Sequence, residues 1–201
     1  MTDDPNTATG LAREDAPSLS DIASPDEGQG AWPKGWYKAR SIEGFATGKG
    51  TQFVTGDVFS KDRNSRNIVI CFNVKGDVFV PSSTNPSERK LSTGPSGDRN
   101  LFYRMNYRPE AVNAQTVAAI KEAYTRFKKV NAFPSKEMQA VALSLGRIGQ
   151  LEKALGYKLP FRDGHYDPTV ATGHDWDIRL DIDEKGFNTI EAVAASGAHV
   201  K

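Results

Sequence analysis

Apolar and polar side chains alternate along several stretches of the chain, and this two-residue period predicts β-strands that bury one face. The clearest stretch is 65–80, whereas 35–60 has strand character interrupted by glycines, which predicts a bent strand and a turn. Residues 99–108 and 176–195 predict one further strand and a closing hairpin. The alternating apolar residues of the clearest stretch are Ile68, Ile70, Phe72 and Val74. Together these stretches predict a chain built mainly from β-strands.

The period changes to that of a helix in the segments 113–130 and 135–156, where apolar residues recur every three or four positions. Asn113 and Ser135 precede these segments and are residue types that cap helix N-termini. Gly156 suits the C-terminal end of the second helix. The pattern therefore predicts two helices inserted between the third and fourth strands.

This order of elements is typical of a mainly β fold with a helical insert, of the α+β class. It predicts an OB-fold-like, five-stranded Greek-key barrel with the helices between strands 3 and 4. A small Greek-key sandwich with a helical insert fits the same order. In an OB fold, one strand face and two loops form a common platform for oligonucleotides.

Charge is distributed unevenly along the chain. Residues 1–31 contain seven acidic residues and one basic residue, whereas residues 32–201 contain 25 basic and 18 acidic residues. The first segment has few large apolar residues, so we expect a disordered acidic tail followed by one nucleic-acid-binding domain over 32–201. The basic excess of the domain suits a polyanionic partner.

Other features predict an intracellular, cytoplasmic protein. Cys71 is the only cysteine, so no disulfide framework is expected. No apolar run has the length of a membrane span, and the acidic N-terminus differs from a signal peptide. We therefore expect no membrane partner.

Two segments that could suggest a phosphate-binding or metal-binding site do not match the motifs of such sites. In GFATGKGT, residues 44–51, three residues rather than four separate Gly44 from Gly48, and Gly50 stands where a phosphate loop needs Ser or Thr. The His and Asp residues of 165–175 match no common metal-ligand spacing. We therefore expect no catalytic residue, no metal and no cofactor.

The segment RNLFYRMNYRPE, residues 99–110, interleaves aromatic residues with arginines. Alternate side chains of a strand point to opposite faces of a sheet. The face that suits a core holds Leu101, Tyr103 and Met105. The opposite face holds Phe102, Arg104 and Asn106. This second face predicts a surface that offers an aromatic ring and a guanidinium group to a ligand.

Cations and aromatic residues also alternate on the other predicted strands and their loops. Single-stranded nucleic acid needs this combination, because cations follow the phosphates and aromatic faces stack with the bases. Arginines would contact phosphates, aromatic rings would stack, and the glycine-rich loop 44–51 would close over the strand. The candidate nucleic-acid-binding residues are Trp36, Lys38, Arg40, Lys49, Arg66, Phe102, Arg104, Tyr107 and Arg108.

Five segments together resemble the phage-encoded single-stranded-DNA-binding proteins. They are GWYKARSIEG, SRNIVICFNV, LFYRMNYRPE, LGRIGQLEKALG and WDIRLDIDEKGFNTIEAVA, and the resemblance covers about residues 32–196. It implies a non-catalytic OB-fold protein that coats single-stranded DNA during phage replication or recombination, in the cytoplasm of the host cell. It also allows self-association and contacts with replication or recombination proteins.

Two other functions fit parts of the sequence. A protein-interaction or virion-associated OB module would bury the aromatic residues at an oligomer interface and bind no nucleic acid. An enzyme acting on nucleic acid would need a carboxylate cluster, for which Asp177, Asp181 and Asp183 are the candidates.

Overall fold

The computed structural model describes residues 30–60 and 64–201. The predicted acidic tail therefore lies outside the described residues, except for Gly30 and Ala31. The helices are α1 (Ala114–Phe127) and α2 (Lys136–Leu155), with short 3-10 turns η2 (Pro86–Glu88), η3 (Pro109–Ala111), η4 (Val130–Ala132) and η5 (Pro168–Ala171). The strands are β1 (Gly35–Ile42), β2 (Gly44–Ala46), β3 (Gln52–Val54), β4 (Gly56–Phe59), β5 (Arg66–Pro81), β6 (Ser92–Thr93), β7 (Asp98–Tyr107), β8 (Phe161–Arg162), β9 (His165–Tyr166), β10 (Asp175–Ile182) and β11 (Asn188–Ala195).

The main sheet is antiparallel and is organised around β5, which is 16 residues long. One edge of β5 pairs with β4 and β1, and the opposite edge pairs with β7 and β6. Beyond β1 the sheet continues through β10 to β11. The prediction of a mainly β, α+β fold with helices between the third and fourth long strands is confirmed.

The sheet is not a closed barrel. Its outer strands β7 and β11 contact each other, but no strand pairing joins them in the described part of the chain. Helix α2 packs against both strands and contributes Ile148 and Leu151 to the main core. A helix thus covers the gap where the expected barrel would close its ladder of hydrogen bonds.

A bulge bends β5 against β1. Tyr37 lies opposite Phe79 but Ala39 lies opposite Val74, so the residues of β5 between these partners bulge out. Gly76 lies in the bulge, and a Cβ atom there would come within 2.2 Å of the carbonyl oxygen of Pro95. A side chain at this position would therefore push the β5–β7 connection away from the sheet.

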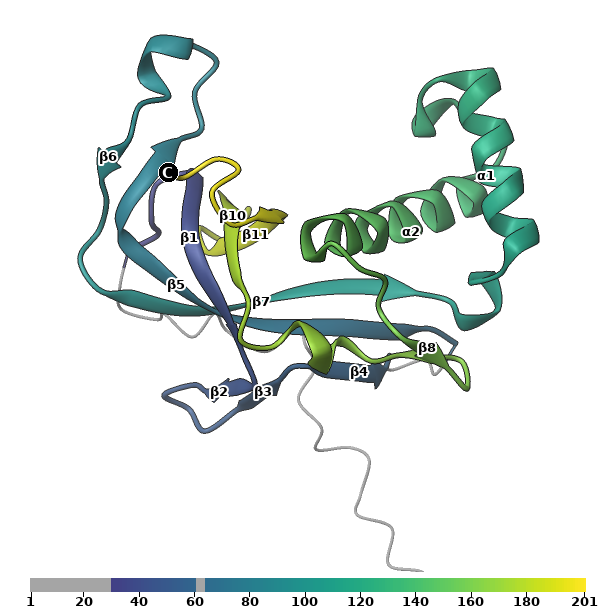
Figure 1. The fold of residues 1–201 in the computed structure, drawn as a ribbon, viewed down its shortest axis with the longest axis horizontal. Helices are drawn as coiled ribbons and strands as arrows, with labels where there is room; N and C mark the ends of the chain where they lie inside the picture. Colours follow the sequence, from purple (N-terminus) through teal and green to yellow (C-terminus); the bar gives the residue numbers. More distant parts are fainter. Residues whose placement is uncertain (1–29, 61–63) are drawn as a thin grey trace, which may run out of the picture.

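The two faces of the sheet are covered differently. Figure 1 shows α1 and α2 on one side of β5 and β7, and the β2–β3 hairpin on the other. The helix side holds the main core, which includes Tyr103, Phe72 and Trp176. On the hairpin side, Phe53 and Cys71 form a smaller buried cluster.

The second cluster corrects the prediction that β5 is half-buried. Val69 and Cys71 alternate with the core residues, yet both are buried because Phe53 of the hairpin covers them. Burial also raises the pKa of the Cys71 thiol to about 11, so the thiol stays protonated and unreactive near neutral pH.

Both helices begin where their sequences predict, and α2 also ends there, whereas α1 ends at Phe127, three residues before the predicted end. The side chains of Asn113 and Ser135 accept hydrogen bonds from the backbone N–H groups of Thr116 and Met138. Gly156 ends α2 in the left-handed conformation, with a φ of 81°. Within the described residues, neither helix has the length and apolar character needed to cross a membrane.

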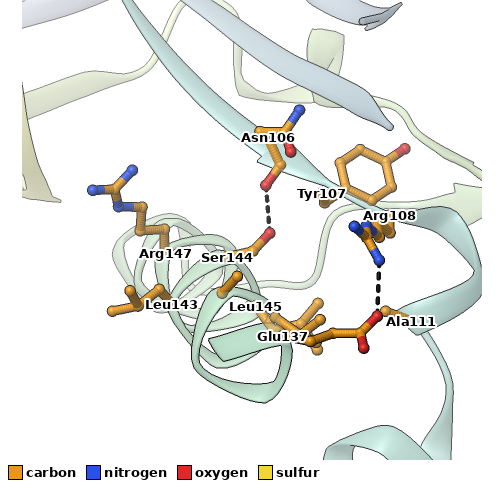
Figure 2. A pocket seen from close by; sticks show the side chains of 11 residues that line it. Asn106, Tyr107, Arg108, Ala111, Glu137, Leu143, Ser144, Leu145 and Arg147 are labelled. Atoms are coloured by element: carbon orange, nitrogen blue, oxygen red, sulfur yellow. Dashed lines mark hydrogen bonds and ion pairs between the residues drawn. The ribbon is translucent and has the colours of Figure 1, made fainter. Parts of the chain in front are cut away.

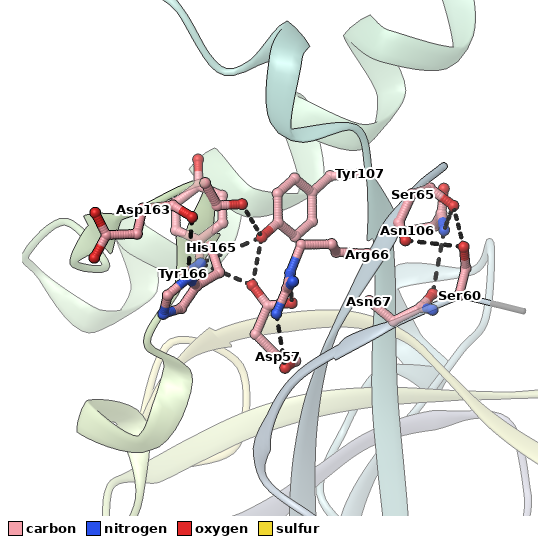
Figure 3. Close-up of polar contacts among 11 residues, drawn as sticks. Asp57, Ser60, Ser65, Arg66, Asn67, Asn106, Tyr107, Asp163, His165 and Tyr166 are labelled. Carbon is pink, nitrogen blue, oxygen red and sulfur yellow. Dashed lines mark hydrogen bonds and ion pairs between the residues drawn. The ribbon is translucent and has the colours of Figure 1, made fainter. Parts of the chain in front are cut away.

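A buried carboxylate joins four strands at one end of the sheet (Figure 3). Asp57 of β4 accepts hydrogen bonds from Arg66 Nε of β5 at 2.9 Å, from the Tyr107 hydroxyl of β7, and from the backbone N–H of Tyr166 of β9 at 2.7 Å. Burial raises the pKa of Tyr166 to about 12 and that of Tyr107 further, so Tyr107 remains a donor.

Substitution of Asp57 by Asn should lower the free energy of unfolding by about 3 kcal/mol, because it leaves Arg66 without its partner at a site where only 14% of the arginine side chain is exposed. The matched control is Asp98→Asn, which breaks the exposed pair with Lys75 and should cost less than about 1 kcal/mol. Urea unfolding measures both. Equal effects of the two substitutions would show that Asp57 has no special structural role.

Candidate nucleic-acid interface

The side of β1, β5 and β7 that faces away from α2 is called here the outer face. Its residues form rows across the sheet, because residues 71–74 of β5 have partners on both β1 and β7. Arg40 of β1, Asn73 of β5 and Asn100 of β7 form one row. Phe102 of β7 lies opposite Cys71 in the next row, and Arg104 follows two residues later. The predicted faces of β7 are confirmed by its burial pattern, in which every second residue is buried.

Three of the predicted cations are exposed on the outer face: Lys38, Arg40 and Arg104. The Arg40 guanidinium is 3.4 Å from the carboxylate of Asp175, but both side chains are more than half exposed, so the pair leaves the cation accessible. Lys38 and Arg104 form no ion pair with any residue in 30–60 or 64–201. These side chains are available to a negatively charged ligand.

The aromatic residues of the outer face are only partly accessible. Phe102 is half-buried and stacks on Phe53 of β3, with ring centroids 4.5 Å apart, and Phe53 in turn stacks on Phe45 of β2. The hairpin therefore covers part of Phe102. Its removal would disturb the packing of the hairpin as well as any contact with a ligand.

Lys49 lies in the turn of the β2–β3 hairpin and is exposed. The neighbouring Gly50 has a φ of 81°, which a glycine adopts without strain. The glycine-rich segment is thus a strand connection with a basic tip, at the border of the outer face.

Two of the candidate residues are corrected by their burial. Tyr107 is 1% exposed, because its place in the alternation of β7 directs it into the core rather than outward. Arg66 is held by Asp57 and lies over the ring of Phe59 at 4.1 Å. Both are occupied by contacts within the fold, so we do not retain them as ligand contacts.

Arg108 lies apart from the outer-face cations. Its guanidinium is 2.9 Å from the carboxylate of Glu137 at the start of α2 (Figure 2). Both residues line a cavity of about 320 Å³ between β7 and α2, which the hydrogen bond from Ser144 to the carbonyl oxygen of Asn106 bridges. The structure therefore places Arg108 on the helix side of β7.

Four further polar residues of the outer face are not among the predicted site residues. Asn73 donates a hydrogen bond from its amide to the side-chain oxygen of Asn100 at 3.1 Å, and Lys75 pairs with Asp98 in the neighbouring row. The alternation of β5 by itself predicts that Asn73 and Lys75 point outward. Their place in a row of polar residues cannot be read from the sequence, because their partners on the neighbouring strands are distant in the chain.

No protein-family model, curated protein or solved structure matches the chain. Within the described residues, no group of three or more His, Cys, Asp or Glu residues is placed to hold a metal ion.

Proposed function

We propose that this protein binds single-stranded DNA on its outer face and acts without catalysis in phage-type replication or recombination. The observation that carries the proposal is the gathering of Lys38, Arg40 and Arg104 on one face of a sheet, beside the half-buried ring of Phe102. Cations beside aromatic rings are the combination that binds phosphates and bases together.

The arrangement of strands supports an OB-type platform. The long strands lie in the order β11, β10, β1, β5 and β7, and the helices fall between β7 and β10. In an OB fold, oligonucleotides bind on the second and third strands and on the loops that flank them. Here those strands are β5 and β7, and the connection from β1 to β5 carries the β2–β3 hairpin with Lys49 at its tip. We treat the sheet as a partly open relative of that barrel.

The resemblance of the sequence to phage-encoded single-stranded-DNA-binding proteins agrees with this use of the outer face. It assigns the protein to the cytoplasm of the host cell, where it would coat exposed strands and meet replication or recombination proteins. The described outer face offers cations that point away from the core, as a coating protein requires for contacts that do not depend on base sequence.

A second candidate function is a protein-interaction module. Next to the cavity at Arg108 lies a second cavity of about 440 Å³ between α1 and α2, which includes Ile120 and Met138. Leu143 of α2 is 55% exposed at the first cavity. This helical region would bind a protein partner or a second copy of the chain, and it is independent of the outer face.

The first test is binding of a fluorescently labelled oligothymidylate, followed by anisotropy, with the corresponding duplex and RNA for comparison. We expect the single strand to bind more tightly than the duplex. If the three outer-face cations each neutralise one phosphate, log Kd should rise with log salt concentration with a slope of about 2. A slope near zero would contradict phosphate contact, and absence of binding would favour the protein-interaction module.

Substitution of Arg104 by Ala should weaken binding and reduce the salt slope by about 0.7, because one phosphate contact is lost. Arg108→Ala is the matched control, since it removes an arginine four residues away that is paired with Glu137. It should leave both quantities unchanged. Thermal melting should show that Arg104→Ala remains folded, because this side chain is exposed. Equal losses of affinity in the two variants would indicate that the DNA-binding surface extends to the side of β7 that faces α2.

Removal of residues 1–29 should tighten binding at low salt, because it removes seven acidic residues and one basic residue that compete with DNA for the basic face. Gly30 should be kept, since its carbonyl oxygen accepts a hydrogen bond from Arg99 at 3.1 Å. The gain should shrink at high salt as the charges are screened. Weaker binding by a truncated protein with an unchanged melting temperature would show that the segment assists binding.

A further inference from the structure

Trp36 differs from the other two tryptophans of the chain. Trp32 and Trp176 are buried in the main core, at 4% and 1% exposure. Trp36 points to the outer side of β1, on the same face as Lys38 and Arg40, and is only partly buried. Directly across the sheet from Trp36 lies Arg179 of β10. An indole ring is thus flanked by cations along its own strand and on the next strand.

The ring of Trp36 is covered by a residue from the far end of the sequence. The imidazole of His199 stacks on the indole, with centroids 3.7 Å apart and an angle of 11° between the ring planes. His199 itself is exposed. A flat aromatic ring therefore occupies the position that a nucleobase would take against the indole.

The backbone around His199 is fixed independently of its side chain. The buried carboxylate of Asp177 accepts hydrogen bonds from the backbone N–H groups of Gly197, His199 and Val200, and the Val200 side chain is fully buried. The imidazole can therefore rotate away from Trp36 without release of the chain. Only the stacking contact between His199 and Trp36 is lost.

Exchange of the two stacks requires little rearrangement. A base would take over the contact with the indole that the imidazole gives up, and this kind of stacking tolerates any base because every base has a π-face. Phosphate contacts add a favourable term that the imidazole lacks. A nucleobase that is brought to the site by phosphate contacts at Lys38 would therefore compete with the imidazole.

We infer that Trp36 is a base-stacking site for single-stranded DNA and that His199 occupies this site in the unbound protein and is displaced by the base. This inference rests on the proposed function, and it places one nucleotide of the bound strand beside Lys38. Trp36 thus keeps the stacking role that the sequence predicts, but His199 covers its ring in the unbound protein.

The test measures oligothymidylate affinity in the full chain with His199→Ala and His199→Phe. The first variant uncovers Trp36 and should bind about 2- to 10-fold more tightly, because no stack has to be broken. The second places a more strongly stacking ring over Trp36 and should bind more weakly than the wild type. Both should melt near the wild-type temperature, since the backbone bonds to Asp177 remain.

Tryptophan fluorescence provides a direct second measurement, because the other two tryptophans are buried. Oligothymidylate should change the emission of the wild type and of His199→Ala, and Trp36→Leu should lose this change together with about 5- to 100-fold in affinity. Weaker binding by His199→Ala would overturn the inference, since the base would then stack on His199 itself. Unchanged affinity in all three variants, with normal binding by the wild type, would overturn the inference alone. Absence of binding by the wild type would overturn the proposed function as well.

Discussion

Strand β5 determines where the other long strands of the sheet are placed. It pairs along both edges and is covered on both faces, by the main core on one side and by the β2–β3 hairpin on the other. A strand in this position cannot slip by one residue without exchanging the two buried sets of side chains. The register of β1 and β7 follows from it, and so do the rows of residues on the outer face.

Asp57 stabilises the end of the sheet at which β4 pairs with β5. A buried carboxylate is costly unless its oxygens are hydrogen-bonded, and here three strands other than its own supply the donors. The network therefore holds β4 and the β8–β9 hairpin against β5 and β7, at the end of the sheet where Arg104 lies. A stable sheet end is what allows an exposed arginine to keep a defined position for a ligand.

Local patterns predicted much of the fold and part of the candidate site. The alternation of β7 placed Tyr103 inward and Arg104 outward, and Asn113 and Ser135 marked the starts of both helices. The burial of Arg66 was not predictable, because the reason for it is a carboxylate whose partners converge only in the folded chain. The cover over Trp36 was missed for the same reason, since His199 lies at the other end of the sequence.

The anchoring of the last residues against β10 has a practical consequence for handling the protein. Val200 is buried and its backbone is tied to Asp177, so any group fused after Lys201 is held close to Trp36 and Lys38. A bulky purification tag at this end would crowd the outer face and lower the apparent affinity. A small environment-sensitive dye at the same end would instead be well placed to report the arrival of a ligand.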